Sequence, residues 1–405
     1  MFDYTLLPIE PNEQKIVLVI LDGLGGVPVN GKTELESAWV ANLDKLAVGS
    51  SLGLLTPIAR GVIPGSGAAH LAIFGYDPVR YSVGRGVLEA LGSGLIPGAA
   101  DLCARANFAT VDERGVVVDR RAKERGERMR TEECVALCAQ LQEKIREIDG
   151  VKVTIRPGKE HRFVVMFSGP GLADGLEDSD PGREGRQVQV VRAQRPEAAQ
   201  AARIVNRFVE LAAEVLKGRS RANYVLLRGL ALPPVVPNFQ QRYKLRAAAI
   251  AAYPMYRGLA RLVGMEVLAC GESWDEELTA LEQNYGNYEF FYIHFKEFDQ
   301  AGEDGNFERK VELLEQFDEQ VVPRLVRLNP DVLCITGDHS TPAVLKGHSW
   351  HTVPFLLKSR WVRVHSYAEE FGERACLRGS LGLIHGQEVM PLLLANAQKL
   401  GKFGA

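Results

Sequence analysis

The chain has 405 residues, of which 46% are hydrophobic and 24% charged, so it can bury a large core and form about two domains. Its formal net charge of −3 and pI near 6.3 exclude the overall basic character of many nucleic-acid-binding proteins. No apolar run approaches the roughly 20 residues of a membrane span, and the opening segment lacks the pattern of a signal peptide. We therefore expect a cytoplasmic protein that binds neither nucleic acid nor membrane, with its six sparse cysteines reduced.

The N-terminal part of the chain begins with a clear strand signal. The apolar, β-branched run 15–21 predicts a buried parallel strand that ends at Asp22. Residues 33–38 and 42–47 have the pattern of helical turns. The glycine-rich stretch 53–98 indicates a region dominated by loops, and such regions often carry function.

The middle of the chain has a different pattern, which begins near residue 101. Strands are expected at 105–111, 115–119, 151–155, 162–167 and 224–228, and helices at 131–148 and 196–216. This succession is typical of a separate α+β domain. The proline-rich segment 232–237 that follows it is the best linker candidate.

Beyond this linker, strands and helices alternate again. Strands are expected at 247–251, 290–295, 332–336 and 354–357, and helices at 257–263 and 307–326. Such alternation predicts an α/β fold with a mostly parallel central sheet.

Metal-binding side chains follow several of these strands. Asp22, Asp299, Asp338, His339 and His348 offer carboxylate and imidazole ligands from distant parts of the chain. A lone aspartate before glycine is usually a turn former, but together the five indicate a site for two divalent ions, which suits phosphoryl displacement. Since Asp338 and His339 are adjacent after a strand, we expect them to point to opposite sides and to serve different ions.

The ligands lie on both sides of the middle section, so the metal-binding domain is expected to be discontinuous. The sequence predicts a core formed by residues 1–98 and 236–405 that holds the metal site. A smaller α+β domain, residues 99–235, is expected to be inserted into it.

Nine further motifs carry a family resemblance that runs nearly end to end. They are LDGLGG at 21–26, PGSGAAHLAIFGYDP at 64–78, GRGVLEALGSG at 84–94, RANFATVD at 105–112, VDRRA at 118–122, DSDP at 178–181, TGDHSTP at 336–342, RGSLG at 378–382 and GQEVMPLLL at 386–394. The chain resembles the archaeal-type, 2,3-bisphosphoglycerate-independent phosphoglycerate mutases of the alkaline phosphatase superfamily. The resemblance implies an alkaline-phosphatase-like core with an inserted domain, and interconversion of 2- and 3-phosphoglycerate in glycolysis and gluconeogenesis.

The resemblance also implies a role for each candidate residue of the core. Ser66 would accept the phosphoryl group as a phosphoserine and return it to the other hydroxyl of a reoriented glycerate; serine needs a base or a metal to become nucleophilic. By analogy, one ion would be held by Asp22, Ser66, Asp338 and His339, and the other by Asp299, Glu303 and His348. Two divalent ions are therefore expected, manganese or magnesium ahead of zinc or cobalt, with no organic cofactor.

The inserted domain would bind the phosphate and carboxylate of a small phosphorylated three-carbon acid. Arginine suits both groups because its planar fork donates paired hydrogen bonds. The candidates are Arg105, Arg120, Arg121 and Arg228, with Asp178 and Asp180 as proton carriers or hydroxyl ligands and Lys296 as a charge that neutralises phosphate. Each arginine is as readily interpreted as a solvated surface residue.

Three positions depart from the family pattern. Glu303 replaces the usual histidine, and this carboxylate favours harder ions unless it is only a solvated loop residue. Gly67 replaces an acidic residue, and Ser168 replaces an arginine. Two alternatives to the mutase therefore stay open: a phosphatase or mutase for another phosphorylated metabolite, and a catalytically silent paralogue that binds a metabolite or a protein.

Overall fold

The computed structural model describes residues 4–123, 126–363 and 370–404. The chain divides into two compact units. We call Met1–Ser82 together with Val236–Ala405 the core unit, and Val83–Val235 the second unit. No helix among the described residues is long and apolar enough to cross a membrane.

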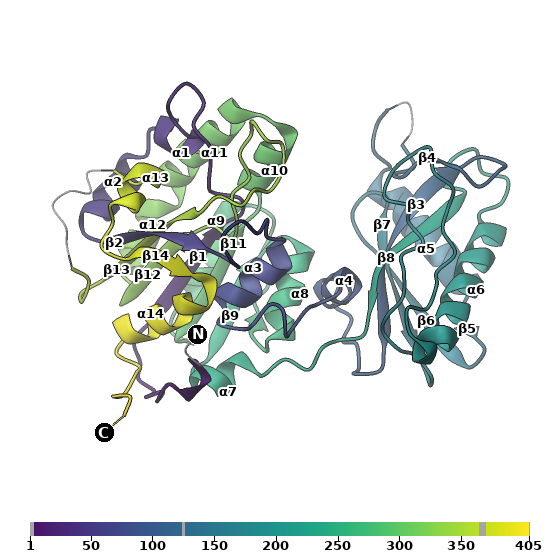
Figure 1. Ribbon diagram of the computed structural model, residues 1–405, viewed down its shortest axis with the longest axis horizontal. Coiled ribbons are helices and arrows are strands. Elements are labelled where there is room, and N and C mark those ends of the chain that lie inside the picture. The colour runs from purple at the N-terminus through teal and green to yellow at the C-terminus, as the bar shows by residue number, and fades with distance from the viewer. Residues whose placement is uncertain (1–3, 124–125, 364–369, 405) are drawn as a thin grey trace. The chain divides into compact units, whose positions relative to one another are not determined.

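The core unit is built around an eight-stranded sheet with the strand order β10-β9-β11-β1-β12-β13-β2-β14 (Figure 1). Its strands are β1 (Ile16–Leu21), β2 (Ser51–Thr56), β9 (Ala247–Ala251), β10 (Glu266–Val267), β11 (Phe290–Phe295), β12 (Val332–Thr336), β13 (Val353–Ser359) and β14 (Gly382–His385). Neighbouring strands are parallel except where β13 pairs with β12 and β2. The predicted α/β fold class is confirmed.

Helices pack against this sheet and connect its strands. They are α1 (Glu34–Ser37), α2 (Ala41–Val48), α3 (Ser66–Ile73), α7 (Phe239–Tyr243), α8 (Pro254–Leu262), α9 (Trp274–Asn284), α10 (Glu297–Asp304), α11 (Phe307–Gln320), α12 (Val322–Leu328), α13 (Glu373–Leu377) and α14 (Val389–Asn396), with short 3-10 helices at Tyr4–Leu6 and Gly386–Glu388. The single helix expected over 307–326 is two helices. Pro323 lies in the first turn of α12 and cannot donate the backbone hydrogen bond that would continue α11.

The second unit is an antiparallel sheet with helices. Its elements are α4 (Arg85–Gly92), β3 (Leu102–Val111), β4 (Val117–Asp119), α5 (Thr131–Lys144), β5 (Glu147–Ile148), β6 (Val151–Pro157), β7 (Arg162–Ser168), a 3-10 helix (Pro196–Ala198), α6 (Ala199–Val215) and β8 (Tyr224–Ala231). The strands run β4-β3-β7-β6-β5, and β8 pairs with the long strand β3. Leucine, valine and phenylalanine side chains fill the layer between this sheet and α5 and α6.

The region 53–98 contains most of β2 and the helices α3 and α4, whose N-caps are Gly65 and Gly84, and loops and turns connect them. Short helices that begin at glycine carry little periodic signal. The second unit begins at Val83 rather than at residue 99, because α4 packs on β3 and β8. A Cβ on Gly86 would lie 2.4 Å from the carbonyl oxygen of Cys103, so glycine permits this close packing.

A buried acid on α9 makes the stability of the fold depend on pH. Glu277 is 2% exposed, its Oε1 accepts a hydrogen bond from the Ala252 N–H at 2.9 Å, and burial raises its pKa to about 8. A raised folded-state pKa gives stability that is present below the unfolded value near 4.5 and is lost as pH rises through about 8. We expect Glu277→Gln to match the parent near pH 5 and to be more stable at pH 9, by a few kcal/mol at most.

This prediction is checked by denaturant unfolding of both proteins across that pH range in the absence of metal. Glu319→Gln, which changes an exposed glutamate of the same unit, is the matched control. Equal pH profiles for the parent and Glu277→Gln would contradict the expectation.

Candidate metal centre

Three adjacent parallel strands bring the candidate ligands to one edge of the core sheet. In the register, Leu21 of β1 pairs with Phe295 of β11, and Ile20 pairs with Thr336 of β12. Asp22 is the first residue after β1, and its N–H donates to the carbonyl of Phe295 at 2.9 Å. The carboxyl ends of parallel strands are where open α/β sheets place their chemistry. The sheet therefore explains why side chains more than 300 positions apart meet.

The first ligand group is Asp22, Asp338 and His339, whose ligand atoms all lie within 4.8 Å of one another. The Nε2 of His339 is 3.3 Å from Asp22 Oδ1 and 3.2 Å from Asp338 Oδ2. All three residues are fully buried, and neither of these two oxygens has a hydrogen-bond partner among the described residues. Buried carboxylate oxygens are costly without a partner, and a divalent cation would supply one, so the residues fit a metal ion.

The second ligand group is Asp299, His339 and His348. The Oδ1 of Asp299 lies 3.5 Å from His348 Nε2 and 4.0 Å from His339 Nδ1. The Nδ1–H of His348 donates to the carbonyl of Pro64 at 2.8 Å, which leaves its Nε2 lone pair free for a ligand role. The two imidazole rings stack with their centroids 3.6 Å apart.

Thr341 connects the two groups and was not predicted from the sequence. Its hydroxyl donates to Asp299 Oδ1 at 2.7 Å and lies 3.0 Å from the Nδ1 of His339. Because that O–H is given to Asp299, the hydroxyl oxygen accepts from the Nδ1–H of His339. The Nε2 of His339 then presents its lone pair toward Asp22 and Asp338, the tautomer that metal binding requires.

Ser66 is the first residue of α3, and its Oγ lies 3.0 Å from the Nε2 of His339. The Nδ1–H of His70, one turn further along the helix, donates to the Ser66 carbonyl at 2.8 Å. His70 is fully buried, and burial together with the nearby His294 lowers its pKa to about 3, so its ring is neutral. The structure thus gives His70 a role in holding the serine backbone.

Asp22 is surrounded by the predicted candidate Lys296 and by two groups that the sequence analysis missed, Tyr256 and His294. The Tyr256 hydroxyl donates to its Oδ2, and His294 Nε2 lies 3.2 Å and Lys296 Nζ 3.0 Å from the same oxygen. Burial would raise the pKa of Asp22, but Lys296 and His294 hold it well below its usual range. His294 is the only strongly polar side chain of the apolar strand β11, a signal that could have revealed it. Tyr256 lies on α8 and has no such signal.

Three predicted site residues lie differently from their expected geometry. Asp338 and His339 do not point to opposite sides: β12 ends at Thr336, so the alternation of a strand does not apply, and the two side chains converge. Glu303 lies one helical turn after Asp299 on α10, with Oε1 4.0 Å from His348 Nε2 and a side chain 56% exposed. Glu303 is therefore at the rim of the second group. Lys296 also forms an ion pair with Asp299 within the core unit.

The predicted substrate residues of the second unit form a network of their own. Arg120 makes a bidentate ion pair with the buried Asp180, at 3.0 and 2.6 Å. Arg228 Nε lies 3.6 Å from Asp180 and 3.9 Å from Asp178. Arg105, the register partner of Arg228 on β3, has its Nη1 3.6 Å from Glu89.

The remaining candidate, Arg121, is exposed but contributes to a positive environment in this unit. Burial and the charges of Arg162, Arg121 and Arg105 together lower the pKa of His161 to about 3. Several guanidinium groups therefore act on one buried imidazole. An anion would be attracted to such a region.

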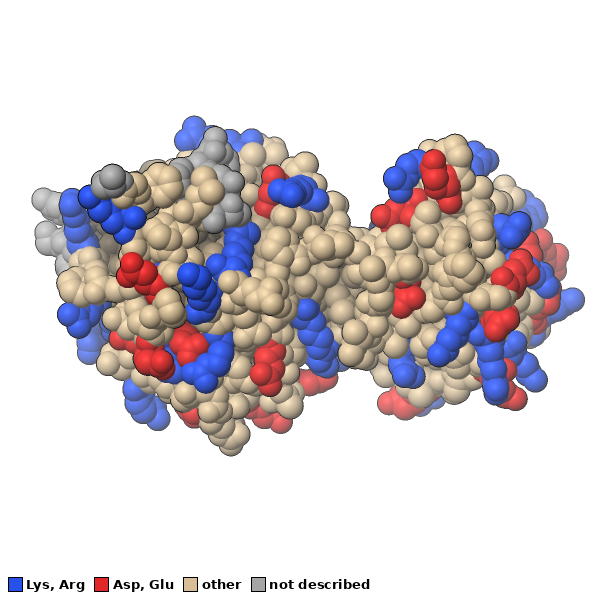
Figure 2. Space-filling model, turned by 90° about the horizontal axis from the view of Figure 1, so that it is seen from below, with Lys and Arg blue, Asp and Glu red and all other residues tan. Residues whose placement is uncertain are grey.

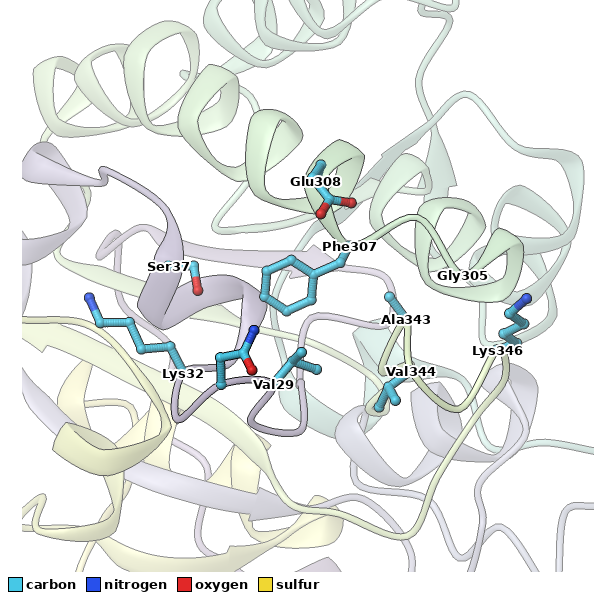
Figure 3. A pocket seen from close by; sticks show the side chains of 10 residues that line it. Val29, Lys32, Ser37, Gly305, Phe307, Glu308, Ala343, Val344 and Lys346 are labelled. Carbon is cyan, nitrogen blue, oxygen red and sulfur yellow. The ribbon is translucent and has the colours of Figure 1, made fainter.

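Other surface features of the protein have less to do with this chemistry. A pocket of about 600 Å³ on the core unit contains none of the candidate ligands. Phe307 occupies its middle, and Lys32 and Lys346 lie at its two ends with their ammonium groups directed away from each other (Figure 3). On the face shown in Figure 2, basic and acidic side chains are interspersed over each unit, so that face carries no large patch of one sign.

Fold and site together define an α/β protein with candidate ligand groups for divalent ions at the carboxyl ends of its mostly parallel sheet. Residues 47–221 match the family model of 2,3-bisphosphoglycerate-independent phosphoglycerate mutase. The chain is 51% identical to proteins from Thermotoga maritima and Thermus thermophilus that are named as probable enzymes of this kind, over 96% of this chain and of each relative.

Solved structures agree with this assignment. A protein from Pyrococcus horikoshii has a TM-score of 0.82 at 32% identity, over 97% of this chain and 100% of that one. The cofactor-independent phosphoglycerate mutase from Thermoplasma acidophilum has a TM-score of 0.68 at 28% identity, over 95% of this chain and 100% of that one. The chain belongs to the family of 2,3-bisphosphoglycerate-independent phosphoglycerate mutases. The predicted family is confirmed.

Proposed function

We propose that this protein interconverts 2- and 3-phosphoglycerate in glycolysis and gluconeogenesis, in the cytoplasm, through a phosphoserine at Ser66. The observation that carries the proposal is the position of the Ser66 hydroxyl. It lies at the N-terminus of α3 and 3.0 Å from His339, beside two buried carboxylate oxygens that have no hydrogen-bond partner among the described residues. A helix N-terminus stabilises negative charge, which suits a phosphorylated serine at this position. Gly67 stands where the family pattern has an acidic residue, so the first turn of α3 has no carboxylate that would compete with the phosphate.

Two divalent ions belong to the proposal. Asp22, Asp338 and His339, with Ser66, would hold one, and Asp299 and His348 would hold the other, with Glu303 at its rim. When bound, such ions lower the pKa of a hydroxyl and neutralise the charge of a phosphoryl group during transfer. The oxygen-rich ligand set favours manganese or magnesium.

The chain's own residues would carry out a balanced double transfer. The Ser66 oxygen attacks phosphorus as its proton leaves, and the ester bond between phosphorus and the glycerate oxygen breaks as that oxygen takes up a proton. The glycerate then reorients and presents its other hydroxyl. That hydroxyl loses its proton as it attacks the phosphoserine, the bond between phosphorus and Ser66 breaks as the Ser66 oxygen takes up a proton, and no phosphate is lost.

The second unit is proposed as the substrate-binding domain that recognises the glycerate. Arg105, Arg121 and Arg228 would bind its phosphate and carboxylate, whereas Arg120 is already held by Asp180. Asp180 would therefore hold the guanidinium groups of Arg120 and Arg228 in place. Asp178 is the better candidate for a proton carrier, because its partial burial raises its pKa.

A coupled assay tests this function directly. The protein is supplied with 3-phosphoglycerate, without 2,3-bisphosphoglycerate, and with manganese, magnesium, zinc or cobalt in turn. Formation of 2-phosphoglycerate that requires a divalent ion is expected. The loss of an arginine at Ser168 favours, as the second candidate, a phosphatase or a mutase for another phosphorylated metabolite. Release of inorganic phosphate without 2-phosphoglycerate would identify the phosphatase. A protein that binds divalent ions only weakly and forms neither product would be the catalytically silent paralogue.

Glu303 provides a sharper test of the second ion. We expect Glu303→Ala to weaken that ion about 10-fold while the first stays bound, because a carboxylate beside His348 is lost. Glu303→His should keep both ions and shift the preference toward zinc or cobalt, since imidazole is the softer donor. Metal content after dialysis against buffered Mn²⁺ or Zn²⁺ measures both effects.

The control for this experiment is Glu308→Ala, which removes an exposed glutamate a few residues further along the chain. If Glu303→Ala retained two ions with the affinity of the parent, Glu303 would be only a solvated residue of α10.

A further inference from the structure

A buried lysine on α11 connects the two loops that carry the candidate metal ligands. Lys310 is fully buried, and its Nζ donates to the carbonyl oxygens of Gly23 at 2.8 Å, Gly25 at 3.2 Å and Thr341 at 3.0 Å. Gly23 and Gly25 belong to the loop that follows Asp22, and Thr341 belongs to the loop that follows Asp338 and His339. One ammonium group therefore holds both loops.

Two glutamates, the buried Glu34 and the half-buried Glu373, accept hydrogen bonds from N–H groups of the same loops. Glu373 accepts from the N–H of Gly26 at 2.9 Å, and Glu34 accepts from the N–H of Ala343 at 2.8 Å. The charges of Glu34 and Glu373 act on Lys310 and favour its charged form against the effect of burial on its pKa. The ammonium group of Lys310 thus binds carbonyl oxygens of both loops, and the two glutamate carboxylates bind their N–H groups. The backbone of both loops is therefore fixed at its acceptors and at its donors.

The fixed backbone leads directly to the ligand atoms. The N–H of Gly23 donates to Asp338 Oδ1 at 3.2 Å, which aims the other carboxylate oxygen at His339. The hydroxyl of Thr341 lies between Asp299 Oδ1 and His339 Nδ1 and sets the tautomer of that histidine. A shift of either loop would therefore move ligands of both groups at once.

We propose that Lys310 is a positioning residue for the metal centre, which holds Gly23 and Thr341 so that Asp338, Asp299 and His339 keep the geometry for two divalent ions. The inference rests on the proposed function, since it concerns the same ions. Lys310 itself touches neither ion nor substrate. Methionine at this position has a similar length but no N–H group, so three carbonyls would lose a donor and the loops would be free to shift.

Metal titration of the full-length protein tests the proposal. Mn²⁺ binding is measured by calorimetry, and the visible spectrum of the Co²⁺-loaded protein reports the ligand geometry. Lys310→Met is expected to bind at least one ion roughly 10- to 100-fold more weakly and to show an altered Co²⁺ spectrum. Lys399→Met is the matched control, because Lys399 is also buried and donates to the carbonyl and side-chain oxygens of Asn12, outside the metal centre. The control should lose stability without a change in metal affinity or spectrum.

Unchanged affinity and spectrum in Lys310→Met would overturn the proposal and leave the proposed function intact. An absence of metal binding in the parent would overturn both. If Lys310→Met does not fold, Thr341→Val and Thr341→Ser carry the test, since the effect is transmitted through the Thr341 hydroxyl. Valine should alter the Co²⁺ spectrum and serine should restore it; a spectrum in Thr341→Val identical to that of the parent would contradict the proposal.

Discussion

Replacing Ser66 with alanine is expected to lower mutase turnover by roughly 10⁴-fold or more, because the group that accepts the phosphoryl is removed. The fold should be unaffected. Ser66 is only partly buried, it is the first residue of α3, and alanine is a good residue within a helix. The hydroxyl lies 3.0 Å from the Nε2 of His339 and also interacts with the Tyr256 hydroxyl, so the free energy of unfolding should change by about 1 kcal/mol.

The measurement is a single-turnover reaction with substrate labelled in its phosphate, followed by rapid denaturation. Label should remain on the parent protein and be absent from Ser66→Ala. Ser37→Ala removes a hydroxyl of the same unit that contacts only a backbone carbonyl, and it should behave as the parent. Undiminished activity of Ser66→Ala would end the hypothesis of a phosphoserine.

The parts of the fold that the sequence predicted well are those with strong local signals. The apolar runs of β1, β9, β11 and β12 were each placed within a residue or so of their observed ends, because buried parallel strands consist of continuous apolar residues. Short elements such as β10, α7 and α13 were missed. They contain few residues and depend on packing against neighbours rather than on their own pattern.

The site shows the same division between local and non-local information. Asp22, Asp299, Asp338, His339 and His348 were recognised because each stands next to a strand or turn signal, and the structure brings all of them together. Apart from Lys296, their supporting residues were not found.

Those supporting residues come from elements that are distant in the chain. Lys310 and Tyr256 lie within ordinary amphipathic helices, and their roles arise only when the sheet order places α8 and α11 beside the loops of β1 and β12. Side chains that orient ligands act through hydrogen bonds across such elements. A single sequence does not encode that adjacency in any local pattern.

Asp338→Asn is expected to raise the stability of the metal-free protein and to abolish its activity, and these opposite effects test the metal centre most directly. Burial and the negative charges of Asp22 and Asp299 raise the pKa of Asp338 well above its usual range, so its ionised form opposes folding of the metal-free protein at neutral pH. Asparagine has the same shape without the charge. We therefore expect Asp338→Asn to raise the Tm of the metal-free protein by a few degrees.

The same change should abolish function. Asp338 Oδ1 accepts from the N–H groups of Gly23 and His339, at 3.2 and 3.1 Å, and only the oxygen of an asparagine amide can take that place. The NH₂ group must then occupy the position of Oδ2, which faces His339, and it cannot bind a cation. We expect one ion fewer per chain and a loss of turnover of about 10³-fold, as for other groups that stabilise transition-state charge directly.

Calorimetric unfolding with and without Mn²⁺, together with the coupled assay, checks both halves of this expectation. Adding Mn²⁺ should raise the Tm of the parent more than that of Asp338→Asn, because only the parent can bind both ions in its folded state. Asp304→Asn, an exposed aspartate on the same helix as Asp299, controls for the loss of one negative charge. A metal-free Tm that falls in Asp338→Asn would show that this carboxylate supports the fold, and retained turnover would remove it from the metal centre.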